Sequence, residues 1–266
     1  MDLGVAHLNA LELPPEDLIR AAARAGFRSV GLRICPISPG GVHYPLPPGT
    51  EATRRVKRLL ADEGMKVAEV EFINITPDID VQAYAALLET GGELGATALS
   101  VAGEDTDFAR LTDHFAQLCD LAAPYGIRVD VEFMAWRVCA TIQQAATLVA
   151  AAARPNGKVL LDSLHLQRSG GVPADISALP AGAFGAAQVC DAPLAGPTDT
   201  EGLIDEARQN RLLPGDGALP LLDFLRALPA GIPIAAEVPM RGVDPQTRLD
   251  LAFAATQRIL MAVRES

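Results

Sequence analysis

The chain has 266 residues, of which 49% are hydrophobic, and it carries a formal net charge of −11. An acidic chain repels phosphate backbones, and no run of lysines and arginines is present, so we expect no nucleic-acid partner. We expect a cytoplasmic protein without a membrane partner, because the four cysteines form no C-x-x-C motif, the first residues lack the basic stretch of a signal peptide, and no apolar run is long enough for a bilayer.

Apolar runs of strand length alternate with helical segments along the whole chain. The expected strands are residues 2–8, 28–34, 65–75, 97–103, 128–134, 158–165, 185–192 and 232–239. The expected helices are residues 14–26, 50–64, 78–95, 105–126, 141–153, 172–180, 218–229 and 244–266. Eight such β/α units, with no linker between them, predict an α/β fold: a single (β/α)8 TIM barrel formed by residues 1–266.

An open, doubly wound sheet is the alternative architecture. That fold would normally carry a glycine-rich phosphate-binding turn after its first strand. The segment HLNALELPP at residues 7–15 has no glycine. The closed barrel is therefore the preferred prediction.

Four of the expected strands carry an oxygen-bearing side chain near their C-terminal ends. These residues are Glu132, Asp162, Gln188 and Glu237. The carboxyl ends of barrel strands meet at one mouth, where an unpaired carboxylate needs a cation or a hydrogen-bond network. Carboxylate and carboxamide oxygens suit a divalent cation, so the pattern predicts a metal site. Deeper in the barrel, Arg128 and Asp130 share a strand face, and we expect them to form an ion pair.

Further polar residues are candidates for the same mouth. His165 follows Asp162 by three residues, and the alternative for it is a solvated loop histidine. Further candidates are His7, Arg33 and Glu71. Of these, Glu71 would point inward beside Glu69. We expect residues 192–217 to fold over the mouth and to bring Arg208 or Arg211 to an anionic or polyhydroxyl substrate, although two solvated arginines are an equal alternative.

The ordered set of these residues resembles a known family. It comprises Glu132, the Asp162-x-x-His165 motif, Gln188-Val-Cys-Asp191, the LLPGDG turn at residues 212–217, and Glu237. Together these are similar to the xylose isomerase-like TIM-barrel superfamily, which includes sugar phosphate isomerases and epimerases, inosose dehydratases and 3-dehydroshikimate dehydratases.

The resemblance implies a role for each of the matching residues. The metal ligands would be Glu132, Asp162, Gln188 and Glu237, holding one divalent ion (Mn, Mg, Co or Zn). Glu132 and Glu237 would also be the catalytic acid and base, and His165 and an arginine, Arg211 rather than Arg208, would contact substrate. The resemblance also implies a small-molecule substrate and a possible homo-oligomer, a dimer or tetramer.

The reaction that the resemblance implies is proton abstraction next to a carbonyl, through a metal-stabilised enediolate. The leading prediction is an isomerase or epimerase of a small sugar or polyhydroxy carbonyl compound. A dehydratase of the 3-dehydroshikimate or inosose type is the first alternative, and a non-catalytic sugar-binding barrel is the second. Most epimerases of the family have His where this chain has Gln188, and Gln there is similar to bacterial 3-dehydroshikimate dehydratases.

Overall fold

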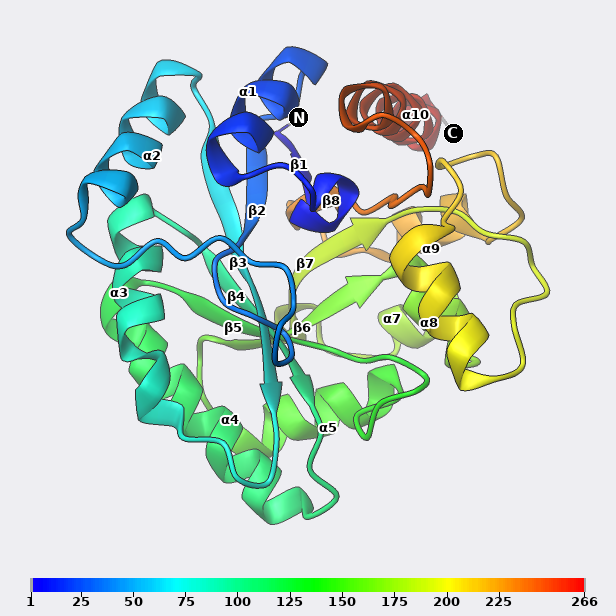
Figure 1. Ribbon diagram of the computed structural model, residues 1–266. Coiled ribbons are helices and arrows are strands. Elements are labelled where there is room, and N and C mark those ends of the chain that lie inside the picture. Colours follow the sequence, from blue (N-terminus) through cyan, green and yellow to red (C-terminus); the bar gives the residue numbers. More distant parts are fainter. Residues whose placement is uncertain (1, 266) are drawn as a thin grey trace.

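The computed structural model describes residues 2–265 and shows a closed barrel of eight parallel strands inside a ring of helices (Figure 1). The strands are β1 (Leu3–Val5), β2 (Ser29–Arg33), β3 (Lys66–Ile75), β4 (Ala98–Gly103), β5 (Arg128–Glu132), β6 (Gly157–Asp162), β7 (Phe184–Val189) and β8 (Ile234–Ala236). Strand β1 pairs with β8 in parallel, which closes the barrel. The predicted fold class is confirmed.

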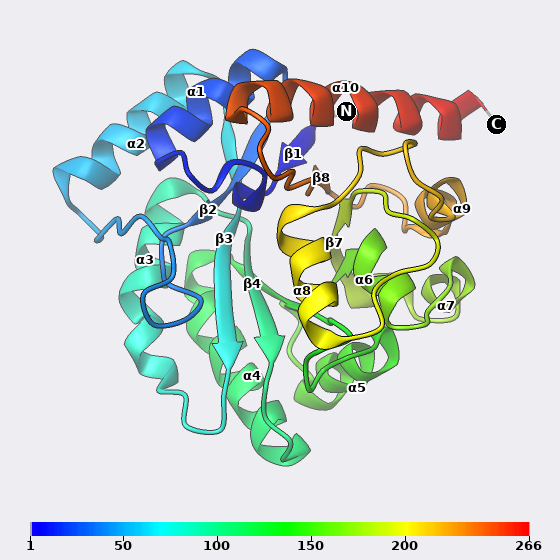
Figure 2. The same cartoon turned by 45° about the vertical axis from the view of Figure 1, so that its right-hand side comes forward.

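Ten α-helices lie among residues 2–265; most of them cover the outside of the barrel, and α8 lies at its mouth (Figures 1 and 2). They are α1 (Pro15–Ala25), α2 (Glu51–Asp62), α3 (Ala85–Leu94), α4 (Phe108–Ala122), α5 (Ile142–Ala152), α6 (Ser163–Arg168), α7 (Pro173–Ser177), α8 (Thr200–Gln209), α9 (Leu221–Ala227) and α10 (Pro245–Glu265). Short 3-10 turns η1 (His7–Ala10), η2 (Val81–Tyr84), η3 (Ala123–Tyr125) and η4 (Ala181–Ala183) complete the described elements. None of the helices within residues 2–265 combines the length and apolarity needed to cross a membrane.

Three elements differ from the sequence-based expectation. Strand β1 is only three residues long, and the chain then turns into η1, so His7 lies beyond the strand. His165 lies in α6, a helix that begins directly after β6. The segment at residues 192–217 contains α8, whose N-terminus is capped by Asp199 accepting a hydrogen bond from the Gly202 N–H at 2.8 Å.

The main core lies between the strands and the helix ring. Outward-facing strand residues such as Leu32, Leu99 and Val131 are fully buried against the helices. The inward faces carry polar side chains instead, including the predicted Arg128–Asp130 ion pair at 3.0 Å. Packing against the helix ring therefore stabilises the barrel from outside. The interior of the barrel can then hold charged groups at one end.

Candidate active site

A cavity of about 480 Å³ opens at the C-terminal ends of the strands. Polar side chains from the barrel form its floor, and the loop after β2 and helix α8 contribute to its walls. An apolar cluster of Phe72, Ala102 and Met134, with Ile37 and Trp136 packed against it, forms one side. The cavity thus combines a charged floor with an apolar wall, as expected of a small-molecule site.

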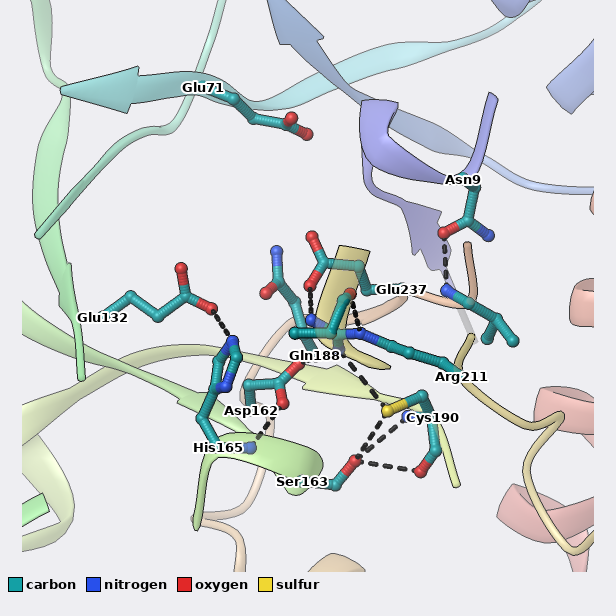
Figure 3. Close-up of polar contacts among 12 residues, drawn as sticks. Asn9, Glu71, Glu132, Asp162, Ser163, His165, Gln188, Cys190, Arg211 and Glu237 are labelled. Carbon is teal, nitrogen blue, oxygen red and sulfur yellow. Dashed lines mark hydrogen bonds and ion pairs between the residues drawn. The ribbon is translucent and has the colours of Figure 1, made fainter. Parts of the chain in front are cut away.

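The four predicted metal ligands are brought together at this floor. Glu132, Asp162, Gln188 and Glu237 are all buried, with 7% or less of each residue exposed. Asp162 and Gln188 are direct partners in the pairing of β6 with β7, so they lie at the same level of the barrel. Glu132 ends β5, and Glu237 directly follows β8. Figure 3 shows these side chains converging.

Arg211 lies at the centre of the group (Figure 3). Its Nη1 is 2.6 Å from Asp162 Oδ2, and its Nη2 is 2.7 Å from Glu237 Oε2. Its Nε donates to the Ala207 carbonyl at 2.7 Å, at the end of α8. Only 3% of the residue is exposed, which excludes the solvated alternative for Arg211. Both carboxylates are therefore already bound to a permanent cation.

His165 is buried beside Asp162. The Asp162 Oδ1 accepts the His165 backbone N–H at 2.9 Å, which caps α6 and fixes the Asp-x-x-His spacing. The His165 Nε2 lies 3.5 Å from Glu132 Oε1, and the indole of Trp136 packs edge-on against the imidazole at 5.2 Å. Burial lowers the pKa of His165 to about 4, so its ring is neutral at physiological pH.

The buried carboxyl groups outnumber the cations among them. Burial, reinforced by Glu237 and Asp162, raises the pKa of Glu132 well above its usual range. Burial also raises the pKa of Glu237 to about 7, although Arg211 opposes this shift. Such shifts mark an excess of negative charge that a divalent cation would neutralise.

The donor atoms fit a divalent metal. One ligand atom each from Glu132, Asp162 and His165 lie within 4.8 Å of one another. The Oε1 atoms of Glu132 and Gln188 are buried, and neither has a hydrogen-bond partner among residues 2–265. Buried oxygens without partners are costly unless a cation or water satisfies them. These oxygens, together with a neutral histidine, are suitable ligands for a divalent ion.

The contacts of His7 do not match a role in substrate contact. Its Nδ1 accepts the Arg33 backbone N–H at 2.8 Å, and its Nε2 lies 2.9 Å from the Leu13 carbonyl. Since Nδ1 accepts, the proton lies on Nε2, which donates to Leu13. The His7 backbone N–H in turn donates to Glu71 Oε1 at 2.6 Å. With both ring nitrogens bonded to backbone, His7 ties η1 to β2, and we do not include it among the substrate contacts.

Arg33 and Glu71 form a buried pair beside the four predicted metal ligands. Arg33 Nη2 lies 3.0 Å from Glu71 Oε2, and both residues line the cavity. The Arg33 Nε is buried and has no hydrogen-bond partner among residues 2–265. Arg33 therefore keeps donors that could reach a bound anion, whereas both oxygens of Glu71 are already occupied.

Arg208 is exposed to the cavity on α8. Among the described residues, its guanidinium has neither a hydrogen-bond nor an ion-pair partner. Partial burial and the nearby charge of Arg33 lower its pKa. Arg208 in turn helps to lower the pKa of Arg137, which pairs with Glu104. Of these three arginines, Arg33 pairs with Glu71 and Arg137 with Glu104, so Arg208 alone keeps its charge without a carboxylate partner among residues 2–265.

Several residues that line the cavity were not predicted from the sequence, or were predicted only in passing. Trp136 and Arg137 follow β5 in a loop that carries no periodic pattern, so no signal marked them. Glu69 lies two residues before Glu71 on the same strand face, and this alternation was the available signal. Ser100 on β4 donates from its Oγ to Glu69 Oε2. The pairing of these two residues depends on the barrel and not on sequence spacing.

Comparison with known proteins identifies the family. The model of the xylose isomerase-like TIM barrel family matches residues 19–258. The chain belongs to this family. The predicted resemblance is therefore confirmed.

Two curated relatives carry a named activity. A 3-dehydroshikimate dehydratase of Pseudomonas aeruginosa is 29% identical over 238 residues, which cover 85% of this chain and 35% of the relative. The enzyme of the same name from Pseudomonas putida is 32% identical over 116 residues, covering 43% of this chain and 18% of the relative. The chain thus spans about a third of the length of the first of these relatives.

Solved structures share the fold at lower identity. A xylose isomerase-like TIM barrel/4-hydroxyphenylpyruvate dioxygenase fusion protein has a TM-score of 0.82 at 22% identity, covering 99% of this chain and 43% of the other. The zinc-binding IOLI protein has a TM-score of 0.80 at 17% identity, covering 99% of both chains. A D-allulose 3-epimerase from Methylomonas has a TM-score of 0.72 at 16% identity, covering 97% of this chain and 98% of the other.

Proposed function

We propose that this protein is a divalent-metal-dependent dehydratase of a small cyclic polyhydroxy ketone that bears a carboxylate, of the 3-dehydroshikimate type. The observation that carries the proposal is Arg208, a guanidinium that faces the cavity without a partner among the described residues. Binding of a neutral sugar would not require an unpaired guanidinium at the mouth of the cavity. A carboxylate accepts a charge-assisted hydrogen bond from it, and the donors of Arg33 lie nearby.

The named relatives support the same choice. Two curated family members that match this chain are 3-dehydroshikimate dehydratases. The apolar wall of Phe72, Met134 and Trp136 suits one face of a ring that is losing one hydroxyl group. We therefore place dehydration ahead of the isomerase or epimerase reaction that the sequence favoured.

Glu132 is the proton acceptor in this proposal. Its Oε1 has no hydrogen-bond partner among the described residues, and its raised pKa makes its carboxylate a stronger base than an ordinary glutamate. It would take the proton from the carbon next to the carbonyl, and the electron pair of that C–H bond would form a carbon–carbon double bond. The neutral imidazole of His165 lies 3.5 Å from this oxygen.

Glu237 is the proton donor. Its pKa of about 7 keeps part of the population protonated near neutral pH. It would give its proton to the leaving β-hydroxyl, so that one water departs and the substrate loses no other atoms. Arg211, 2.7 Å away, stabilises the carboxylate that this transfer leaves behind.

Glu132, Asp162, Gln188 and Glu237 would hold the metal. When bound there, a divalent cation supplies Lewis-acid polarisation of a substrate carbonyl. Asp162 contributes no proton transfer, because both of its oxygens accept hydrogen bonds, from the His165 N–H and from Arg211. Gln188 is neutral, so it adds a donor oxygen without further negative charge.

A substrate screen tests the proposal. Purified protein loaded with Mn²⁺ or Mg²⁺ would be offered 3-dehydroshikimate, inososes and neutral ketoses in D₂O. We expect a conjugated product from the carboxylated ring and none from the ketoses. Turnover of ketoses alone would contradict the proposal and support the second candidate.

An isomerase or epimerase is that second candidate. It is favoured by one observation: two carboxylic acids with raised pKa values, Glu132 and Glu237, enter the same floor from different strands. Such a pair can remove a proton from carbon and return one without loss of water. A non-catalytic sugar-binding barrel would need neither raised pKa nor a set of donors suited to a metal.

A further inference from the structure

We propose that Glu69 is the positioning residue that makes Gln188 an oxygen donor to the metal. The inference rests on the metal site of the proposed function and names a residue outside its four ligands. Glu69 lies on β3, across the barrel from Gln188 on β7. Its contacts determine which end of the Gln188 carboxamide faces the cavity.

The hydrogen bond between them sets the orientation of the amide. Gln188 Nε2 donates to Glu69 Oε1 at 3.0 Å, and both residues are buried. A carboxylate can only accept, so it binds the NH₂ end of the amide. The carbonyl end is thereby turned away, and Gln188 Oε1 is left buried without a partner among residues 2–265. This oxygen is the donor that a metal would use.

Glu69 is itself held in place by a second contact. Its Oε2 accepts the Ser100 hydroxyl on β4, so both of its oxygens act as acceptors. Space for the carboxylates comes from Gly31 on β2, where a Cβ would collide with Glu71 Oε1 and lie 3.2 Å from Glu69 Cγ. The carboxyl group therefore has a fixed position and a fixed role. Burial and the charge of Glu71 raise the pKa of Glu69 to about 8, and a divalent cation bound at the site would favour its ionised, accepting form.

The consequence is a choice of ligand chemistry. An amide oxygen binds hard divalent cations such as Mg²⁺ and Mn²⁺, whereas an amide NH₂ group has no lone pair to offer. If the carboxamide turned over, the site would lose one ligand and point two N–H donors at the cation. Residues that orient metal ligands commonly change metal affinity by about 10- to 100-fold when they are replaced.

Glu69→Gln removes the preference with almost no change of shape. The introduced amide can accept from the Ser100 hydroxyl or donate to it, so its own NH₂ can face Gln188 and draw the Gln188 oxygen away from the cavity. We expect metal-stripped Glu69→Gln protein to bind Mn²⁺ at least about tenfold more weakly in calorimetric titration. The reciprocal variant, Glu69→Gln with Gln188→Glu, restores both a donor–acceptor pair and an oxygen facing the cavity. We expect its Mn²⁺ affinity to return to within about threefold of the parent.

Asp130→Asn is the matched control, because Asp130 is another buried carboxyl group of the same barrel, paired with Arg128. We expect the control to change the melting temperature but not the Mn²⁺ affinity. Parent-like affinity in Glu69→Gln overturns this inference and leaves the metal site standing. Absence of Mn²⁺ binding by the parent overturns the metal site and this inference together. If Glu69→Gln does not fold, the reciprocal variant decides, and its failure to bind Mn²⁺ overturns the proposal.

Discussion

Arg211 donates from Nη1 to Asp162 Oδ2 over 2.6 Å, and both side chains are almost completely shielded from solvent. The pair places a permanent positive charge among acids that we propose as metal ligands. Charges buried in this way are expensive to leave unpaired. Arg211 therefore stabilises the ligand group in the metal-free protein, and a metal would share the carboxylates with it.

Arg211→Met tests this role. Asp162 and Glu237 would lose their shared cation, and breaking a buried ion pair typically costs about 3–5 kcal/mol. We expect a loss of this order in the free energy of unfolding, part of which Mn²⁺ recovers because it neutralises the same acids. Chemical denaturation with and without Mn²⁺ measures both effects. Arg241→Met is the control: its pair with Asp205 is largely exposed, and we expect a loss below about 1 kcal/mol.

Glu132→Gln and Glu237→Gln test the acid and base assignment. Each amide keeps the shape of the side chain but removes proton transfer, so we expect turnover to fall by at least about 100-fold. Mn²⁺ binding must be measured in parallel, since both residues are also proposed ligands. A variant that still binds metal and turns over within about tenfold of the parent would refute its catalytic role.

Arg208→Met tests the carboxylate contact. Removal of a charge-assisted hydrogen bond of about 1.5–3 kcal/mol should raise KM for a carboxylated substrate by about 10- to 160-fold. We expect kcat to change less, because Arg208 lies at the mouth and not at the proposed metal ligands. Arg58→Met is a suitable control, since Arg58 pairs with Glu51 on the surface of α2. An unchanged KM in Arg208→Met would remove the main support for an acidic substrate.

The position of the four strand-end residues at the mouth could be predicted because alternation along a strand determines which face each side chain takes. Glu132, Asp162, Gln188 and Glu237 each followed an apolar run, so their place at the mouth followed from the barrel alone. Helix α8 was missed, although Asp199 and the acidic Glu201 form a normal helix start.

Contacts across the barrel could not be predicted. Glu69 and Gln188 are 119 residues apart, and no spacing rule connects β3 with β7. The same holds for His7, whose Nδ1 is occupied by the backbone N–H of Arg33 on the next strand. Which side chains pair across the barrel depends on the strand register and on how far each side chain extends. Only the folded barrel defines these two properties.

Added metal should counteract the stability that the protein loses as Glu237 ionises at rising pH. The pKa of Glu237 rises from 4.5 to about 7 on folding, so its ionisation opposes folding. In the metal-free protein, the buried, protonated Glu237 contributes to stability. This contribution is complete below about pH 4.5 and is lost as the pH rises through about 7. Bound metal competes with the proton of Glu237, so the increase in melting temperature caused by Mn²⁺ should grow over the same window. Thermal scans from about pH 5 to 8 measure it; a constant increase would contradict the assignment of Glu237 as a ligand.

The central claim is that the cavity dehydrates a carboxylated cyclic ketone with the help of a divalent metal. The most direct measurement is a proton NMR time course of 3-dehydroshikimate with Mg²⁺-loaded protein, repeated after metal removal with a chelator. We expect loss of one water to give an aromatic acid in the loaded sample, no reaction in the stripped one, and recovery when metal is returned. Unchanged substrate with the metal-loaded protein, or equal rates with and without metal, would contradict the account.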